Sequence, residues 1–171
     1  MFNLGRSLLA TLYTLPPDTS KVVVITGCDS GFGHDTALKM SGLGFQVVAC
    51  CLTKEGLKLF SHIPNVYAIQ MDITKEKSVE NAFTMIQQKY PQGIWALINN
   101  AGICDGYYFE FTPMETYRKV MEVNLFGHIL VTKLALPMLK KTKGRVINMA
   151  SLSGRIPTPE MSAYTTSKHA M

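Results

Sequence analysis

Cysteines, charged residues and long apolar runs are all scarce in this 171-residue sequence. The four cysteines, Cys28, Cys50, Cys51 and Cys104, show neither the paired CxxC spacing of a zinc site nor the density of a disulfide-stapled domain. They predict reduced thiols and no structural zinc. With 47% hydrophobic and only 17% charged residues, the composition excludes a disordered chain. Because no run of about 18 uninterrupted apolar residues occurs, the sequence predicts no conventional transmembrane helix.

The net charge of +5 is concentrated in the C-terminal part of the chain. Residues 1–122 carry 10 Lys and Arg against 11 Asp and Glu, whereas residues 123–171 carry 7 against 1. A basic patch can attract nucleic acid or an anionic membrane, but cations also favour the negative C-terminal pole of a helix. No nucleic-acid-binding motif accompanies the charge, so we predict no nucleic-acid partner. We interpret the cluster as a solvated helix end, made up of Lys140, Lys141, Lys143 and Arg145.

The first 20 residues differ from the rest of the chain. Five leucines recur at helical spacing, one arginine is present, and no acidic residue occurs before Asp18. This composition is typical of a targeting or membrane-contact segment, with contact through residues 1–17, although a flexible arm fits it as well. The sequence therefore divides into this segment, residues 1–20, and one domain, residues 21–171.

From residue 21 onward, short apolar runs alternate with helical patterns. Continuous apolar strands of this kind are typical of a parallel sheet that helices cover on both faces. We therefore predict an α/β fold, a doubly wound parallel sheet of the Rossmann type. The expected strands are 22–25, 45–50, 66–71, 94–98 and 145–149, and the expected helices are the stretch up to 42, then 75–90, 114–141 with a break near Asn124, and one that begins near Ser162.

A glycine-rich turn, TGCDSGFG at residues 26–33, joins the first expected strand to the first helix. Glycines permit positive φ and close approach of a pyrophosphate, and a helix N-terminus supplies amide donors and a positive pole. The turn lacks the Gly-Lys-Ser/Thr of a P-loop, but its place between strand and helix favours a dinucleotide site over a simple chain reversal. The candidate binding residues are Gly27, Cys28, Asp29, Ser30, Gly31, Phe32 and Gly33.

Three spaced motifs resemble those of the short-chain dehydrogenase/reductases: TGxxxGxG at 26–33, NNAG at 99–102 and YTTSK at 164–168. The resemblance covers residues 21–171. Three further residues match the family's pattern in order and position, namely Asp72, Asn124 and Ser151. Within the family, TGCDSGFG resembles the branch that contains hydroxysteroid, retinol and 3-hydroxybutyrate dehydrogenases. Several motifs in the right order are a much more specific signal than any one of them.

The resemblance implies a Ser-Tyr-Lys catalytic site. Tyr164 and Lys168 are four residues apart and share one face of a helix, where an ammonium favours the phenolate and makes the tyrosine a better base. Tyr164 would exchange the proton of the substrate alcohol, and Lys168 would also hold the nicotinamide ribose. Ser151 would hydrogen-bond the reacting oxygen as charge develops on it. Asn124 would anchor a water that connects Lys168 to solvent.

The implied cofactor is NAD, with NADP as the alternative. The second expected strand has no acidic residue at its tip to bind a ribose hydroxyl; Lys54 there favours NADP, and Glu55 opposes it. The histidines show no metal-ligand spacing, so we predict no metal. Beyond the glycine-rich turn, the resemblance assigns to the cofactor Asp72 and Ile73 beside the adenine, Asn100, Ala101 and Gly102 along the cleft, and Tyr164 and Lys168 at the nicotinamide.

The resemblance implies a small lipophilic alcohol or ketone, of the steroid or retinoid class, as the substrate. The alternatives are a small hydroxy acid such as 3-hydroxybutyrate, and a cofactor-binding but inactive fragment. A homo-oligomer is expected in the full-length form, and the endoplasmic reticulum membrane, or else the mitochondrion, is the expected location. Because the family's helix continues past Lys168, we expect a C-terminally truncated chain that is poorly stable or inactive by itself.

Overall fold

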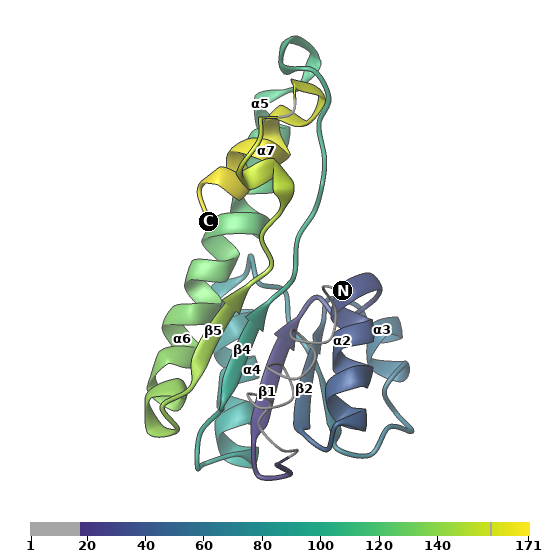
Figure 1. The fold of residues 1–171 in the computed structure, drawn as a ribbon, viewed down its shortest axis with the longest axis vertical. Helices are drawn as coiled ribbons and strands as arrows, with labels where there is room; N and C mark the ends of the chain where they lie inside the picture. The colour runs from purple at the N-terminus through teal and green to yellow at the C-terminus, as the bar shows by residue number, and fades with distance from the viewer. Residues whose placement is uncertain (1–17, 158) are drawn as a thin grey trace, which may run out of the picture.

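The computed structural model describes residues 18–157 and 159–171. The expected membrane-contact segment, residues 1–17, lies outside the described residues. The rest forms one sheet with helices on both of its faces, and two helices, α5 and α7, project beyond the carboxyl ends of the strands (Figure 1). That end of the sheet is where ligands bind in open α/β folds.

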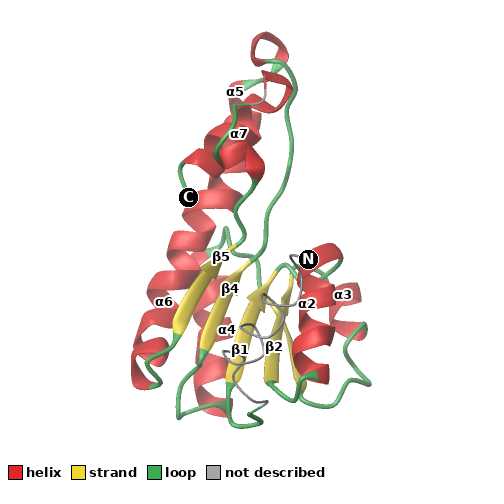
Figure 2. Cartoon of the chain, viewed as in Figure 1, coloured by secondary structure: helices red, strands yellow, loops and turns green. Residues whose placement is uncertain are grey.

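The sheet has five parallel strands in the order β3-β2-β1-β4-β5, so the predicted doubly wound fold is confirmed (Figure 2). All five residues of β1 are buried, as expected for a central strand that is covered on both faces. At one edge of the sheet, all four residues of β5 are exposed. The strands are β1 (Val22–Thr26), β2 (Gln46–Cys51), β3 (Val66–Gln70), β4 (Ala96–Asn99) and β5 (Arg145–Asn148).

The helices form two layers because successive residues of each strand face opposite sides of the sheet. Val22 and Val24 belong to the core that α4 and α6 cover, whereas Val23 and Ile25 belong to the core that includes Ala37 of α2. The predicted helices are present, and the structure adds α3, which the sequence analysis did not predict. The helices are α2 (Gly31–Gly42), α3 (Lys54–Lys58), α4 (Glu76–Lys89), α5 (Met114–Met121), α6 (His128–Lys141) and α7 (Ser162–His169).

The sequence analysis expected a break near Asn124, but α5 and α6 are joined without interruption by a π-helical turn, Glu122–Gly127, called the π turn below. Gly127 permits a close approach here, because a Cβ atom would lie 2.8 Å from the Ile73 side chain. The joined helix, Met114–Lys141, is long and apolar enough to cross a membrane by length and composition alone. In this fold its second half is a core helix, with Val131, Ala135 and Met138 buried.

Candidate functional site

The glycine-rich turn packs directly on the loop that follows β4. Gly27 has a φ of +69°, and a Cβ atom on it would lie 2.7 Å from the Cα of Ala101. A Cβ atom on Gly33 would collide with the carbonyl oxygen of Gly27 and would lie 2.4 Å from the side-chain nitrogen of Asn100. Only glycine therefore fits at these two positions, and their missing side chains bring the turn against the loop.

Hydrogen bonds fasten this turn to the loop after β4. The Thr26 hydroxyl oxygen accepts the backbone N–H groups of Asn100 and Ala101, each at 3.0 Å. The Asn100 side chain returns the contact, donating to the carbonyl oxygens of Thr26 at 2.9 Å and Gly27 at 3.1 Å. Asn100, the second asparagine of the NNAG motif, thus holds two adjacent strand ends at a fixed separation.

A cleft of about 450 Å³ opens above these strand ends. It brings together most of the residues predicted to bind the cofactor. Three residues of the glycine-rich turn do not line it, namely Cys28, Gly31 and Gly33; Cys28 is fully buried and its thiol donates to the Ile25 carbonyl. The lining residues include Gly27, Asp29, Ser30, Phe32, Leu52, Thr53, Asp72, Ile73, Asn100, Ala101, Gly102 and Ile103.

The side chain of Asp29, in the glycine-rich turn, contacts the residues that follow β2. The sequence did not reveal this contact. The Asp29 carboxylate accepts the backbone N–H groups of Leu52 at 2.8 Å and Thr53 at 2.9 Å, and the Thr53 hydroxyl at 2.7 Å. Burial would raise the pKa of this carboxyl, but the hydrogen bonds outweigh burial and hold the pKa below its ordinary value. The carboxylate is therefore ionised at neutral pH, and its bonds weaken only as the pH falls through that lowered pKa.

Asp72 lines the same cleft at the carboxyl end of β3. One of its oxygens accepts both the backbone N–H of Thr74, at 2.9 Å, and the Thr74 hydroxyl, at 2.7 Å. This local turn leaves the second carboxylate oxygen available to a ligand. The neighbouring Ile73 is buried and supplies an apolar wall.

Tyr164 and Lys168 line a second, smaller cavity of about 230 Å³, called the Tyr164 cavity below. Both residues lie on α7, and the Lys168 nitrogen is 5.7 Å from the centre of the tyrosine ring. Lys168 is buried, donates to the Met149 carbonyl at 2.7 Å, and has its pKa lowered by burial. The Tyr164 cavity shares four lining residues with the first cleft, namely Phe32, Asn100, Gly102 and Ile103.

Ser151 follows β5 and caps a short 3₁₀ turn, Leu152–Gly154. Its hydroxyl oxygen accepts the backbone N–H of Ser153 at 3.1 Å, which leaves the hydroxyl proton able to donate elsewhere. The turn packs on α7, because a Cβ atom on Gly154 would lie 2.5 Å from the Lys168 carbonyl oxygen. Ser151 is therefore placed beside the helix that carries Tyr164, although it does not line the Tyr164 cavity itself.

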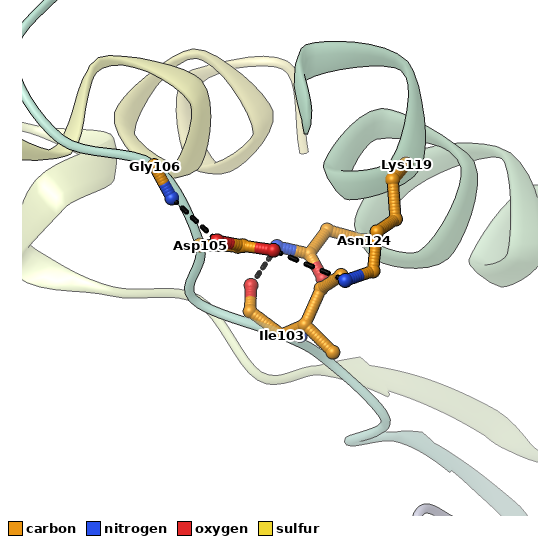
Figure 3. A network of polar contacts seen from close by, with 5 residues as sticks. All are labelled: Ile103, Asp105, Gly106, Lys119 and Asn124. Atoms are coloured by element: carbon orange, nitrogen blue, oxygen red, sulfur yellow. Dashed lines mark hydrogen bonds and ion pairs between the residues drawn. The ribbon is translucent and has the colours of Figure 1, made fainter. Parts of the chain in front are cut away.

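Asn124, buried in the π turn, forms hydrogen bonds with the loop after β4 (Figure 3). Its side-chain oxygen accepts the Ile103 N–H at 2.9 Å, and its nitrogen donates to the Ile103 carbonyl at 2.9 Å and to the Ser167 hydroxyl at 3.0 Å. Figure 3 also shows an adjacent ion pair between Lys119 and Asp105. The Nζ atom of Lys119 lies 3.0 Å from Oδ2 of Asp105. Asn124 therefore connects the cofactor-side loop to α7.

The sequence analysis found no metal-ligand spacing among the histidines and missed the contact of His128 with the site. The imidazole is buried, and its Nε2 lies 2.6 Å from the Ala101 carbonyl oxygen. The one available signal was its spacing of four residues from Asn124, about one helical turn. Across residues 18–157 and 159–171, no three His, Cys, Asp or Glu side chains gather as potential metal ligands.

The parallel sheet, the glycine-lined turn and the cleft at the strand ends define a dinucleotide-binding α/β domain. A family model described as short chain dehydrogenase matches residues 21–171. The chain belongs to the short-chain dehydrogenase family, as the resemblance of its motifs predicted. Among solved structures, a short-chain dehydrogenase from Streptomyces avermitilis superposes with a TM-score of 0.81 and 28% identity, covering 88% of this chain and 56% of that one.

Curated relatives refine the branch within the family. The chain is 42% identical to mouse estradiol 17-beta-dehydrogenase 2, covering 98% of this chain and 50% of the relative. It is 40% identical to bovine mitochondrial D-beta-hydroxybutyrate dehydrogenase, covering 96% and 50%, and 40% identical to rabbit 11-beta-hydroxysteroid dehydrogenase type 2, covering 91% and 40%. The predicted branch is confirmed, and the chain spans about half the length of these relatives or less.

Proposed function

We propose that the protein is an oxidoreductase that transfers a hydride between NAD(H) and a lipophilic secondary alcohol or ketone of the steroid or retinoid class. One observation carries the proposal: the first cleft and the Tyr164 cavity share a wall, formed by Phe32, Asn100, Gly102 and Ile103. A dinucleotide whose adenine lies beside Asp72 and Ile73 would extend along that wall and end beside the Tyr164–Lys168 pair.

The residues present fit such a cofactor. Gly27 and Gly33 keep the turn free of side chains, so that a pyrophosphate can approach the backbone and the N-terminus of α2. When bound, the nicotinamide supplies the hydride chemistry. Phe32, whose side chain is 76% exposed, borders both cavities and is free to cover the cofactor where the two meet.

The chain's own residues supply the proton chemistry. We assign to Tyr164 the transfer of the proton at the substrate oxygen, and to the nearby Lys168 ammonium the stabilisation of the phenolate. Ser151, whose hydroxyl oxygen accepts the Ser153 N–H, donates its one hydroxyl proton to the same oxygen, where charge develops in the transition state. Asn124 uses both amide hydrogens on Ile103 and Ser167, so any water it anchors binds to the remaining lone pair or to its backbone carbonyl.

The lining of the Tyr164 cavity favours a lipophilic substrate. Its wall includes Cys104, Met149 and Ala150, which present weakly polar or apolar surface. A hydroxy acid would require a cation to pair with its carboxylate. Among the described residues that line this cavity, the only cation is Lys168, which the proposed mechanism already uses.

A substrate panel tests this function. Purified protein is incubated with NAD and a steroid alcohol, all-trans-retinol or 3-hydroxybutyrate, and NADH formation is followed. Turnover of a steroid or retinoid by the full-length form is expected. Exclusive turnover of 3-hydroxybutyrate would support the hydroxy-acid alternative, and NADH binding without any turnover would support the inactive-fragment alternative.

The position of Asp29 supports NAD over NADP. Its ionised carboxylate occupies the tip of β2, where the sequence showed no acid, and would repel a 2′-phosphate on the adenosine ribose. We expect Asp29→Asn to lower the NAD/NADP ratio of kcat/KM about tenfold, because the charge is lost while an amide oxygen still accepts a hydrogen bond. Asp35→Asn, the same change at an exposed residue of α2 that does not line the cleft, is the control. An unchanged ratio in Asp29→Asn would contradict this role.

Location and assembly follow as further parts of the proposal. We place the protein at the endoplasmic reticulum membrane through residues 1–17, with the mitochondrion as the alternative that the name of the bovine hydroxybutyrate relative suggests. A homo-oligomer stays a prediction from the family resemblance.

A further inference from the structure

His128, the first residue of α6, reaches from the helix to the loop after β4. Only 5% of its surface is exposed, and its Nε2 lies 2.6 Å from the carbonyl oxygen of Ala101. Since a carbonyl cannot donate, Nε2 must carry the proton. Burial lowers the pKa of the imidazole and the charge of Lys168 lowers it further, against the raising effect of the Ala101 bond. The side chain is therefore the neutral Nε2–H tautomer at neutral pH.

Ala101 is held from three directions. Its N–H donates to the hydroxyl of Thr26 at the end of β1, its Cα packs under Gly27, and its carbonyl accepts from His128. The first two contacts belong to the glycine-rich turn. The third is the only contact of the three that comes from the helical layer.

The same joined helix forms hydrogen bonds with the loop after β4 at a second residue. The side chain of Asn124, about one helical turn before His128, accepts the N–H of Ile103 and donates to its carbonyl oxygen (Figure 3). Ala101 and Ile103 are alternate residues of the loop, and Ile103 lies on the wall shared by the first cleft and the Tyr164 cavity. The loop after β4 is therefore bonded to the helix at two residues, Ala101 in the first cleft and Ile103 in the shared wall.

The other ring nitrogen shows that His128 is not simply filling space. Its Nδ1 is buried and has no hydrogen-bond partner among the residues that the structure describes, and the same is true of the Asn99 side-chain oxygen. Both residues line a cavity of about 320 Å³ between α6 and β5. A buried polar atom without a partner is destabilising, and an apolar side chain would avoid that penalty. The imidazole at this position is therefore explained by its bond to Ala101.

We propose that His128 is a positioning residue for the nicotinamide cofactor. Its Nε2–H fixes the position of the Ala101 carbonyl, and through Ala101 it fixes the packing against Gly27 and the loop that forms the wall shared by the two cavities. The inference rests on the proposed function, because it requires that the cleft bind NAD(H). It assigns to the start of α6 a share of cofactor affinity that the family motifs do not place there.

Three variants separate positioning from packing. His128→Gln carries an amide N–H at nearly the reach of Nε2, His128→Asn places its donor one atom short, and His128→Leu has none. We expect the Kd for NADH, measured by fluorescence titration, to rise about tenfold in the Leu and Asn variants, equivalent to about 1.4 kcal/mol, and to stay within about threefold in the Gln variant. KM for NAD should follow Kd, with kcat changed less.

The melting temperature of each variant is measured in parallel. A lower melting temperature with an unchanged Kd, or equal losses of affinity in the Gln and Leu variants, would overturn the proposal. Should His128→Leu fail to fold, the Gln and Asn pair decides the question by itself. If the unaltered protein does not bind NADH, the proposed function fails; if it binds and the variants bind equally well, only the role of His128 fails.

Discussion

Replacing Tyr164 by phenylalanine is expected to lower kcat about a thousandfold while leaving the Kd for NADH within about twofold. The substitution removes only the hydroxyl that exchanges a proton with the substrate. The ring remains, so its packing on α7 beside the Lys168 nitrogen, 5.7 Å from the ring centre, is retained. Turnover of the best alcohol in the panel and fluorescence titration with NADH measure the two quantities.

Tyr67→Phe is the matched control, because it removes a phenolic hydroxyl from β3 at a residue that lines neither cavity. Its kcat and Kd should equal those of the unaltered protein. Turnover in Tyr164→Phe above about a tenth of the original would remove the tyrosine from its assigned role, since general acid–base groups contribute at least about a hundredfold.

Gly33→Ala is expected to raise the Kd for NADH more than a hundredfold and to reduce the free energy of unfolding by about 3 kcal/mol. The added methyl group would collide with the Gly27 carbonyl oxygen and would lie 2.4 Å from the Asn100 nitrogen. Relief of the collision requires the turn to separate from the loop after β4. That movement breaks the hydrogen bonds from Asn100 to Thr26 and Gly27 and distorts the proposed pyrophosphate site in the glycine-rich turn.

Gly42→Ala provides the control on the same helix. A Cβ atom on Gly42 would meet no atom of the described residues within 4 Å, and the φ of Gly42 is not in the left-handed region, so the variant should be neutral or more stable by up to about 1 kcal/mol. Chemical denaturation and NADH titration of both variants make the comparison. Equal stability and affinity in the two variants would contradict the close packing at Gly33.

The strands were predictable from sequence because each is a short run with an apolar centre, a pattern typical of a parallel sheet. The helix α3 was missed because five residues are too few to show a period. The π turn was predicted as a break, since an additional residue in a helical turn disturbs the periodicity in the same way that an interruption does. Local pattern thus located the strands and the longer helices, missed α3 and misjudged one junction.

The site was predictable as far as its motifs are local. Tyr164 and Lys168 share a helix, and the spacing of the two residues reveals the pair. The role of Asp29 was not predictable, because its carboxylate binds backbone groups 23 and 24 residues further along the chain. The contact of His128 with Ala101 spans 27 residues and depends on how α6 lies against the loop after β4. Contacts of this kind follow from topology and leave no pattern in the sequence around either partner.

The π turn also sets a phase relationship along the joined helix Met114–Lys141. The first half of this helix contacts α7, and the second half contacts α4 and the sheet. Each residue of an α-helix advances by about 100°, so the deletion of one residue within the π turn would rotate one half against the other by about that angle. The π turn therefore fixes the angle between the half of the helix that contacts α7 and the half that contacts α4 and the sheet, and a change in its length, unlike a point substitution, would misalign these two sets of contacts.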